Sequence, residues 1–338
     1  MEKSVSEKID IFSHILPPKF KDALHRKAKP CYYLDVASNC PALFDLENRF
    51  RVMDKFEGRR EVLTLGTPPL EYAVSGKDTI GLAKLANDEM AELILRYPDR
   101  FFAAVASLPM NDIDAALLET DRAVKDLDFK GIQIFSPVNG KPLDSPEFMS
   151  LYDKMEKYDL PIWIHPARDR SVPDYPGERG SKYSLFGMFG WPYETSLAMA
   201  RLVFSGVMDK YPKIKIITHH CGGMIPFCAR RIGASSGFAK AVNLQKMSKH
   251  PIEYFRMFFA DTVLNGNTAG LMCGYHFFGP DQMVFASDYP YPGGAKEGDR
   301  MLGQTIESIE IMDIPQGEKD KIFFKNARRL LRMSGKAS

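Results

Sequence analysis

Short apolar runs alternate with longer amphipathic stretches along the whole chain. The short runs predict strands, which span residues 8–14, 61–66, 102–107, 130–136, 161–165, 214–220, 256–261 and 283–288. The stretches between them have the apolar spacing of helices, as in residues 82–97, 113–127, 146–158 and 195–211. Strands that alternate with helices form parallel sheets with crossover helices. The pattern therefore predicts an α/β protein.

Eight strands favour a closed (β/α)8 TIM barrel, and an open doubly wound sheet is the alternative. Prolines after Tyr97 and Tyr211 end two of the predicted helices, and residues 319–333 predict a basic closing helix. The sequence contains no internal repeat and no low-complexity linker. We therefore expect one domain over residues 1–338.

Two segments are longer than ordinary barrel loops. Residues 15–57 follow the first predicted strand, and residues 166–194 follow the fifth. Both are expected to leave from the C-terminal face, where barrel loops shape the substrate pocket. Their aromatic and arginine side chains suit a planar, anionic ligand, and Arg168 and Trp191 are candidate substrate-binding residues.

Four predicted strands end in a histidine or an aspartate: His14, His165, His220 and Asp288. A (β/α)8 barrel assembles its active site from the C-terminal ends of its strands. Neutral imidazoles and a carboxylate suit a divalent ion such as Zn²⁺, so His14, His165 and Asp288 are candidate metal ligands. Taken alone, His14 is equally compatible with a buried structural histidine. Strand alternation predicts that Asp10, Phe12 and His14 face one way.

Composition narrows the class of protein. With 45% hydrophobic and 26% charged residues, the chain is typical of globular proteins, and a net charge of +2 gives no indication of a nucleic-acid partner. No apolar run approaches the roughly 20 residues of a membrane span. Five cysteines without a CxxC pair indicate reduced thiols and a cytoplasmic protein. Cys221 either lines the site or fills the core.

Several longer motifs are distinctive in combination. Through them the chain resembles the amidohydrolase superfamily almost end to end, in the branch named for aminocarboxymuconate-semialdehyde decarboxylase, which includes hydroxybenzoate decarboxylases. The motifs that carry the resemblance are IDIFSHILP at 9–17, LPIWIHP at 160–166, GWPYET at 190–195, HCGGMIPF at 220–227, SDYP at 287–290 and NARRLL at 326–331.

The resemblance implies a site for one divalent metal ion, zinc first and manganese or magnesium as alternatives. It implies His14, His165 and Asp288 as ligands, and His220 with Asp288 in proton handling. It places Arg231, or the adjacent Arg230, at the substrate carboxylate. It also implies a homodimer. His219 should point away from the site if His220 points into it, which predicts a structural role for His219.

Position 12 departs from the family pattern, which has His-x-His at the end of the first strand where this chain has Phe12 and His14. Phenylalanine supplies no ligand atom. The chain then holds its metal through His14, His165 and Asp288 alone, or it has lost the metal. Phe12 is also a candidate wall for the substrate ring.

These observations predict a metal-dependent, non-oxidative decarboxylase of a small aromatic or dienoic carboxylic acid. A hydrolase or hydratase that uses metal-activated water on the same scaffold is one alternative. A metal-free binding protein or pseudoenzyme, suggested by Phe12, is the other. Asp261, at the end of the seventh predicted strand, is expected to line the pocket, to orient a ligand or to be structural.

Overall fold

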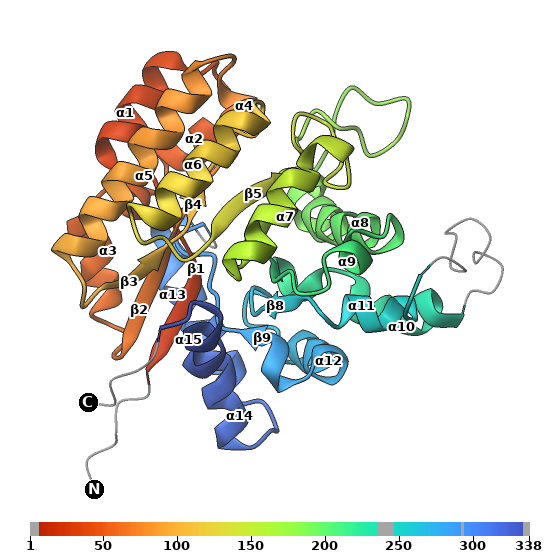
Figure 1. The fold of residues 1–338 in the computed structure, drawn as a ribbon. Coiled ribbons are helices and arrows are strands. Elements are labelled where there is room, and N and C mark those ends of the chain that lie inside the picture. The colour runs from red at the N-terminus through yellow and green to blue at the C-terminus, as the bar shows by residue number, and fades with distance from the viewer. Residues whose placement is uncertain (1–6, 235–246, 292–293, 334–338) are drawn as a thin grey trace, which may run out of the picture.

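The computed structural model describes residues 7–234, 247–291 and 294–333. Parallel strands lie at its centre and helices surround them (Figure 1). The strands are β1 (Lys8–Ile15), β2 (Arg59–Leu65), β3 (Phe101–Ala104), β4 (Ala106–Ser107), β5 (Ile132–Ser136), β6 (Ile162–Pro166), β7 (Ile216–Thr218), β8 (Phe259–Asp261) and β9 (Met283–Val284). All eight predicted strands are confirmed, and the third is divided into β3 and β4 at Val105.

The strands pair in the order of the sequence. One sheet has the order β1-β2-β3, and the other runs from β4 to β9 without a crossover between non-neighbours. The backbone N–H of Val105 donates to Leu63, which links the two sheets, and that of His14 donates to Tyr289, beyond β9. This sequential order is that of a (β/α)8 barrel, whereas a doubly wound sheet reverses its order at a switch point.

The helices fill the predicted intervals. They are α1 (Pro18–Lys27), α2 (Tyr32–Ser38), α3 (Leu46–Met53), α4 (Leu70–Ala73), α5 (Asp78–Arg96), α6 (Ile113–Lys125), α7 (Met149–Tyr158), α8 (Trp191–Phe204), α9 (Val207–Lys210), α10 (Ile225–Ala234), α11 (Pro251–Phe255), α12 (Thr268–Phe278), α13 (Gly294–Glu310), α14 (Gln316–Asp320) and α15 (Asn326–Leu330). Helix α5 ends just before Tyr97-Pro98, as predicted. The closing helix is present as α14, a π-helical turn and α15. No helix within the described ranges has the length and apolarity needed to cross a bilayer.

The core has two layers, which follow from strand alternation. Ile216 packs in the layer between the strands and the helices, whereas its neighbour Ile217 packs in the barrel interior with Phe12 and Trp163. Leu330 of α15 and the following Leu331 belong to the same interior cluster. The basic closing segment therefore buries an apolar face against one end of the barrel.

Strand β1 is irregular between Asp10 and Ser13, where its pairing with β2 shifts register. Ile11 and Phe12 both pack into the interior cluster, whereas the Asp10 carboxylate binds the Arg59 guanidinium outside it. A bulge of this kind re-aims the side chains that follow it. The prediction that Asp10 shares a face with Phe12 and His14 is therefore wrong.

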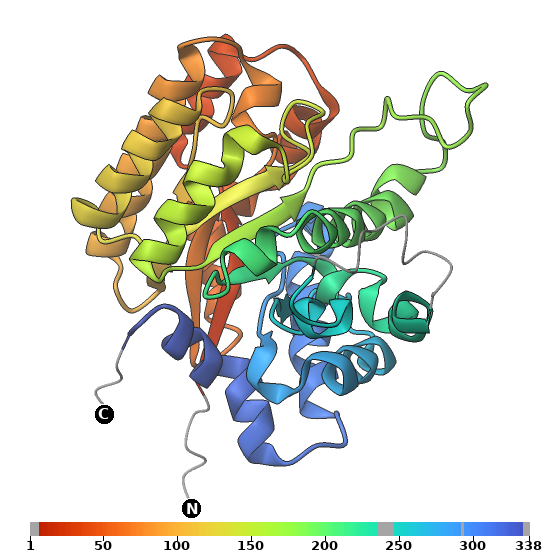
Figure 2. The same cartoon turned by 45° about the vertical axis from the view of Figure 1, so that its right-hand side comes forward.

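The two long loops differ in content. Residues 15–57 fold into α1, α2, a 3-10 turn at Pro41–Leu43 and α3, whereas residues 166–194 have little regular structure before the π turn at Phe186–Gly190. Figure 2 shows the second segment leaving β6 and returning to α8 on the outside of the molecule. Both segments leave from the C-terminal ends of strands, as predicted.

Candidate metal centre and active site

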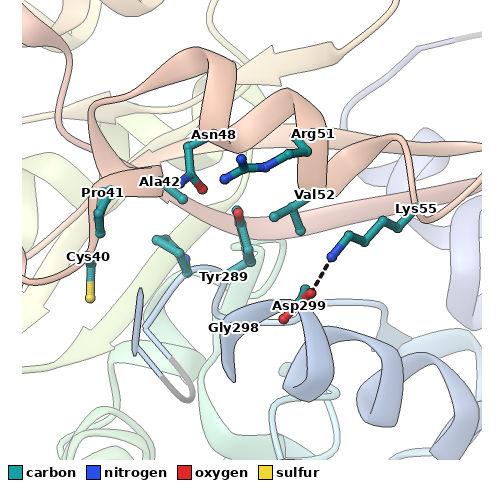
Figure 3. Close-up of a pocket in the computed structure, with 11 residues that line it drawn as sticks. Cys40, Pro41, Ala42, Asn48, Arg51, Val52, Lys55, Tyr289, Gly298 and Asp299 are labelled. Carbon is teal, nitrogen blue, oxygen red and sulfur yellow. Dashed lines mark hydrogen bonds and ion pairs between the residues drawn. The ribbon is translucent and has the colours of Figure 1, made fainter. Parts of the chain in front are cut away.

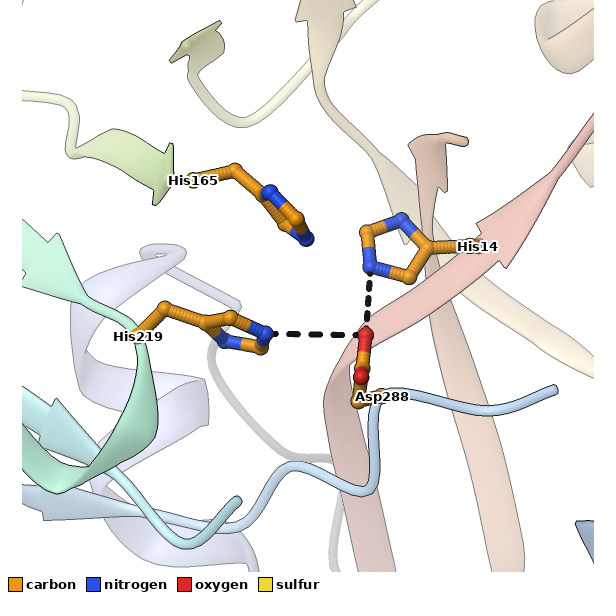
Figure 4. A group of neighbouring side chains, drawn as sticks. All are labelled: His14, His165, His219 and Asp288. Atoms are coloured by element: carbon orange, nitrogen blue, oxygen red, sulfur yellow. Dashed lines mark ion pairs between the residues drawn. The ribbon is translucent and has the colours of Figure 1, made fainter. Parts of the chain in front are cut away.

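Three histidines and one aspartate meet at the C-terminal end of the barrel. They are His14 of β1, His165 of β6, His219 after β7 and Asp288 after β9 (Figure 4). One ligand atom from each lies within 4.8 Å of the others, and all four residues are buried. These are the residue types that bind Zn²⁺ and similar divalent ions.

Each imidazole is oriented by a hydrogen bond through its Nδ1 atom to a group outside the cluster. The partners are Thr64 Oγ1 at 3.0 Å for His14, the Pro166 carbonyl at 2.8 Å for His165, and Asp261 Oδ2 at 2.5 Å for His219. Metal-binding histidines characteristically engage their second nitrogen in this way. The arrangement leaves the Nε2 atoms of His14 and His219 to face Asp288.

The inner atoms of the cluster lack hydrogen-bond partners. His14 Nε2 lies 2.9 Å and His219 Nε2 3.5 Å from Asp288 Oδ1, yet none of the three atoms has a partner in hydrogen-bonding geometry. Buried polar atoms without partners are costly in an apo protein. A divalent cation would satisfy all three at once, so the donor set fits a metal ion.

Burial and neighbouring charges shift the pKa values of Asp288, His165 and His219. Burial raises the pKa of Asp288, but the neighbouring His14 and His219 outweigh it and hold that pKa well below its usual range. Burial, reinforced by His219 and His14, lowers the pKa of His165 well below its ordinary value, so this ligand is neutral. Burial also lowers the pKa of His219, but Asp261 and Asp288 outweigh it and raise that pKa to about 9. A bound dication would displace this proton, because metal ligands are deprotonated.

The prediction that His219 points away from the site is wrong. Ile217 faces the barrel interior, so strand alternation brings His219, two residues on, to the same side. The expectation assumed that His220 points into the site from a regular strand. Strand β7 instead ends at Thr218, and the backbone turns at His220, whose φ is +54°. The Ile217–His219 spacing was the signal that could have identified the fourth member of the cluster.

His220 reaches the cavity through this turn. Its ring lies 4.2 Å from that of His219 and 6.5 Å from that of Trp191, and its Nδ1 atom has no hydrogen-bond partner. Burial and the neighbouring His219 lower the pKa of His220 well below its ordinary value. Gly223, with φ +60°, completes the turn where a Cβ would meet the Pro192 carbonyl at 2.3 Å.

A cavity of about 530 Å³ opens above the cluster. Asp288 and His220 form part of its wall, so both lie where a ligand enters. The rest is neutral, and the described residues that line it include neither lysine nor arginine. Its aromatic members are Tyr32, Tyr33, Phe186, Trp191 and Tyr291.

Of the four candidate substrate-binding residues, only Trp191 lines this cavity. Trp191 lies in the wall of this cavity, 6.2 Å from the His165 ring. Arg168 lines a neighbouring cavity, and its carbonyl accepts a hydrogen bond from Trp191 Nε1 at 3.0 Å. Arg231 is exposed on α10 and is not among the lining residues. Phe12 is 0% exposed and packs beneath the cluster, 4.6 Å from the His219 ring.

The sequence left the roles of Asp261 and Cys221 open, and their surroundings in the structure indicate these roles. Asp261 orients His219 and accepts a hydrogen bond from the backbone N–H of Cys221 at 2.8 Å. Cys221 is itself buried in the layer between strands and helices. Asp261 therefore positions a member of the cluster, and Cys221 fills the core.

Another cavity, of about 220 Å³, lies between α3 and α13 (Figure 3). Cys40, Tyr289 and Arg51 line it, and Lys55 pairs with Asp299 across one side at 2.5 Å. It includes none of the four cluster residues. The aromatic-walled cavity is therefore the better candidate for the active site.

A parallel (β/α)8 arrangement with histidine and aspartate donors gathered at its strand ends defines a metal-binding enzyme of the amidohydrolase type. The amidohydrolase family model matches residues 44–333, and the chain belongs to this family.

Relatives and solved structures cover nearly the whole chain. The chain is 30% identical to gamma-resorcylate decarboxylase from Rhizobium radiobacter, over 87% of this chain and 89% of that protein. It is 28% identical to 2-amino-3-carboxymuconate-6-semialdehyde decarboxylase from Dictyostelium discoideum, over 96% of this chain and 92% of that protein. A crystal structure of 2,6-dihydroxybenzoate decarboxylase with 2,6-dihydroxybenzoate superposes with a TM-score of 0.81 and 26% identity. The superposition covers 98% of this chain and 100% of that chain.

Proposed function

We propose that the protein is a metal-dependent, non-oxidative decarboxylase of a small aromatic or dienoic carboxylic acid. The observation that carries this proposal is the convergence of unpaired donors from His14, His219 and Asp288 beneath an aromatic-walled cavity. The relatives act on hydroxylated aromatic acids and on an aminocarboxymuconate semialdehyde, which fit such a cavity.

His14, His165 and Asp288 would hold the metal ion, for which we propose zinc, with manganese or magnesium as alternatives. When bound, the ion supplies Lewis acidity and a template for the substrate carboxylate and a neighbouring oxygen. Tyr32, Tyr33 and Trp191 form apolar walls that orient a planar ring and exclude water.

His220 is the residue we assign to proton transfer. Its Nδ1 atom has no hydrogen-bond partner and the residue lines the cavity, so it can accept the proton of a substrate hydroxyl and return it to the ring carbon that loses CO₂. Protonation makes that carbon tetrahedral and allows the C–C bond to break. The Asp288 carboxylate, ionised beside His14, favours the positive charge that develops on His220.

We also propose that two chains associate. Exposed apolar side chains gather near the start of α8 and of α10, and a second copy would cover them. They are Phe189, Tyr193, Leu197, Met224 and Phe227. Light scattering of the purified protein tests this association.

The decisive experiment measures CO₂ release. Purified protein is incubated with 2,6-dihydroxybenzoate, 5-carboxyvanillate and 2-amino-3-carboxymuconate semialdehyde, before and after chelation. We expect CO₂ from at least one acid, loss of that activity on metal removal and recovery on adding Zn²⁺. Release of a C–C or lactone fragment instead of CO₂ would identify a hydrolase, and activity that survives complete metal removal would exclude the proposed chemistry.

A further inference from the structure

We propose that His219 replaces the metal ligand that Phe12 cannot supply, so that one ligand has moved from β1 to the end of β7. The ion would then be held by His14, His165, His219 and Asp288, with Asp261 holding His219 in place. The inference rests on the metal centre of the proposed function and goes beyond it by naming the fourth ligand.

Phe12 closes the β1 side of the site. Its ring is 0% exposed and lies 5.9 Å from that of His14, 6.1 Å from that of His165 and 4.6 Å from that of His219. The phenyl group therefore occupies the space beneath all three imidazoles. A phenyl ring has no donor atom for a metal, so position 12 contributes no ligand.

His219 brings a donor to the same point from another strand. Its ring lies 4.6 Å from that of His165, and its Nε2 atom faces Asp288 Oδ1 at 3.5 Å without a hydrogen-bond partner. The adjacent His220 does not belong to the group of four donors. Of the two neighbouring histidines, the first therefore has the geometry of a ligand.

Asp261 fixes the orientation that coordination requires. Its Oδ2 atom binds His219 Nδ1, and its Oδ1 atom accepts from the backbone N–H groups of Cys221 and Val263 at 2.8 and 3.1 Å. The carboxylate is thus held by the turn itself. A carboxylate on the outer nitrogen of a histidine sets the tautomer and raises the basicity of the inner nitrogen, as in other metal sites.

The test measures Zn²⁺ affinity by competition with a chelator, using the full-length chain. We expect His219→Gln to weaken binding by about 100-fold or more and Asp261→Asn to weaken it by roughly 10- to 100-fold. The matched control, His220→Gln, changes the neighbouring imidazole and should leave Zn²⁺ affinity within about threefold. The double variant Phe12→His/His219→Gln should recover most of the lost affinity, because a ligand returns on β1.

Zn²⁺ affinity in His219→Gln that equals that of the parent overturns the inference, as does equal loss in His220→Gln. If the substituted chains do not fold, X-ray absorption of the Zn²⁺-loaded parent decides, since the proposal requires three imidazole ligands and the alternative two. The outcome is separable from the proposed function. Ligation by His219 without CO₂ release would contradict the decarboxylase alone, and CO₂ release with two imidazoles would contradict this inference alone.

Discussion

His219 and His220 are neighbours in the sequence with different surroundings. Asp261 and Asp288 hold a proton on His219, whereas burial and that same charge keep His220 neutral. Titratable groups whose environments push their pKa values apart are typical of active sites. The pair therefore divides into a residue suited to the metal and a residue suited to proton transfer.

This division gives a prediction for His220. The change His220→Asn removes the imidazole at the cavity wall and leaves the four donors of the cluster in place. We expect metal content to equal that of the parent and kcat for CO₂ release to fall by roughly 100-fold or more. Activity within a few-fold of the parent would show that His220 transfers no proton.

At the scale of elements, a buried ionic network holds β1 against its neighbours. Arg49 of α3 is 0% exposed, and its guanidinium donates to Glu61 of β2 at 2.6 Å and to the His14 carbonyl at 2.7 Å. Arg59 joins Glu61 to Asp10, which also accepts from the backbone N–H of Ser287 at 3.0 Å. The network therefore connects the strand that carries His14 with the segment that carries Asp288.

Arg49→Met tests this network. The change leaves the buried Glu61 carboxylate with one cation fewer and the His14 carbonyl without a donor. We expect the free energy of unfolding to fall by about 3–5 kcal/mol, the usual cost of breaking a buried ion pair. Arg51→Met, an exposed change on the same helix, should shift it by about 0.5 kcal/mol or less in denaturant titrations. Equal stability of the two variants would contradict the role of Arg49.

The elements were largely predictable, and the site only partly so. Apolar periodicity located the strands and helices because alternation and helical spacing are local properties of the chain. The bulge after Asp10 and the turn at His220 were not predictable, because backbone irregularities leave no periodic signal. Both errors of orientation, at Asp10 and at His219, come from applying strict alternation across such points. The positions of Tyr32 and Tyr291 in one cavity wall were not predictable either, because they depend on how loops far apart in the sequence pack together.

At the scale of the whole molecule, the stability of the fold also depends on buried titratable groups outside the active-site cavity, such as Glu71. Glu71 of α4 lines a cavity of about 280 Å³ with Arg168 and Glu194, and its Oε1 atom has no hydrogen-bond partner. Burial, opposed only by a backbone hydrogen bond, raises the pKa of Glu71 to about 7. The folded protein therefore retains a proton that the unfolded chain releases at lower pH.

This linkage predicts a pH-dependent effect of Glu71→Gln. The unfolded carboxyl titrates near 4.5, so the parent loses stability from Glu71 as the pH rises from there to about 7. Glutamine does not titrate. The variant should therefore gain roughly 2 kcal/mol in unfolding free energy relative to the parent between pH 5 and pH 8. A difference between the two proteins that is constant over this range would contradict a raised pKa for Glu71.

The described wall of the active-site cavity contains neither lysine nor arginine. An acid anion that enters there meets the ionised Asp288, and the charge that attracts it is that of the metal ion. Metal and anion then bind cooperatively, and each strengthens the other by the same factor. In a cell rich in the acid, the protein would therefore bind its metal ion more tightly. In a metal-starved cell, the protein would lose its affinity for the acid while the chain stayed folded.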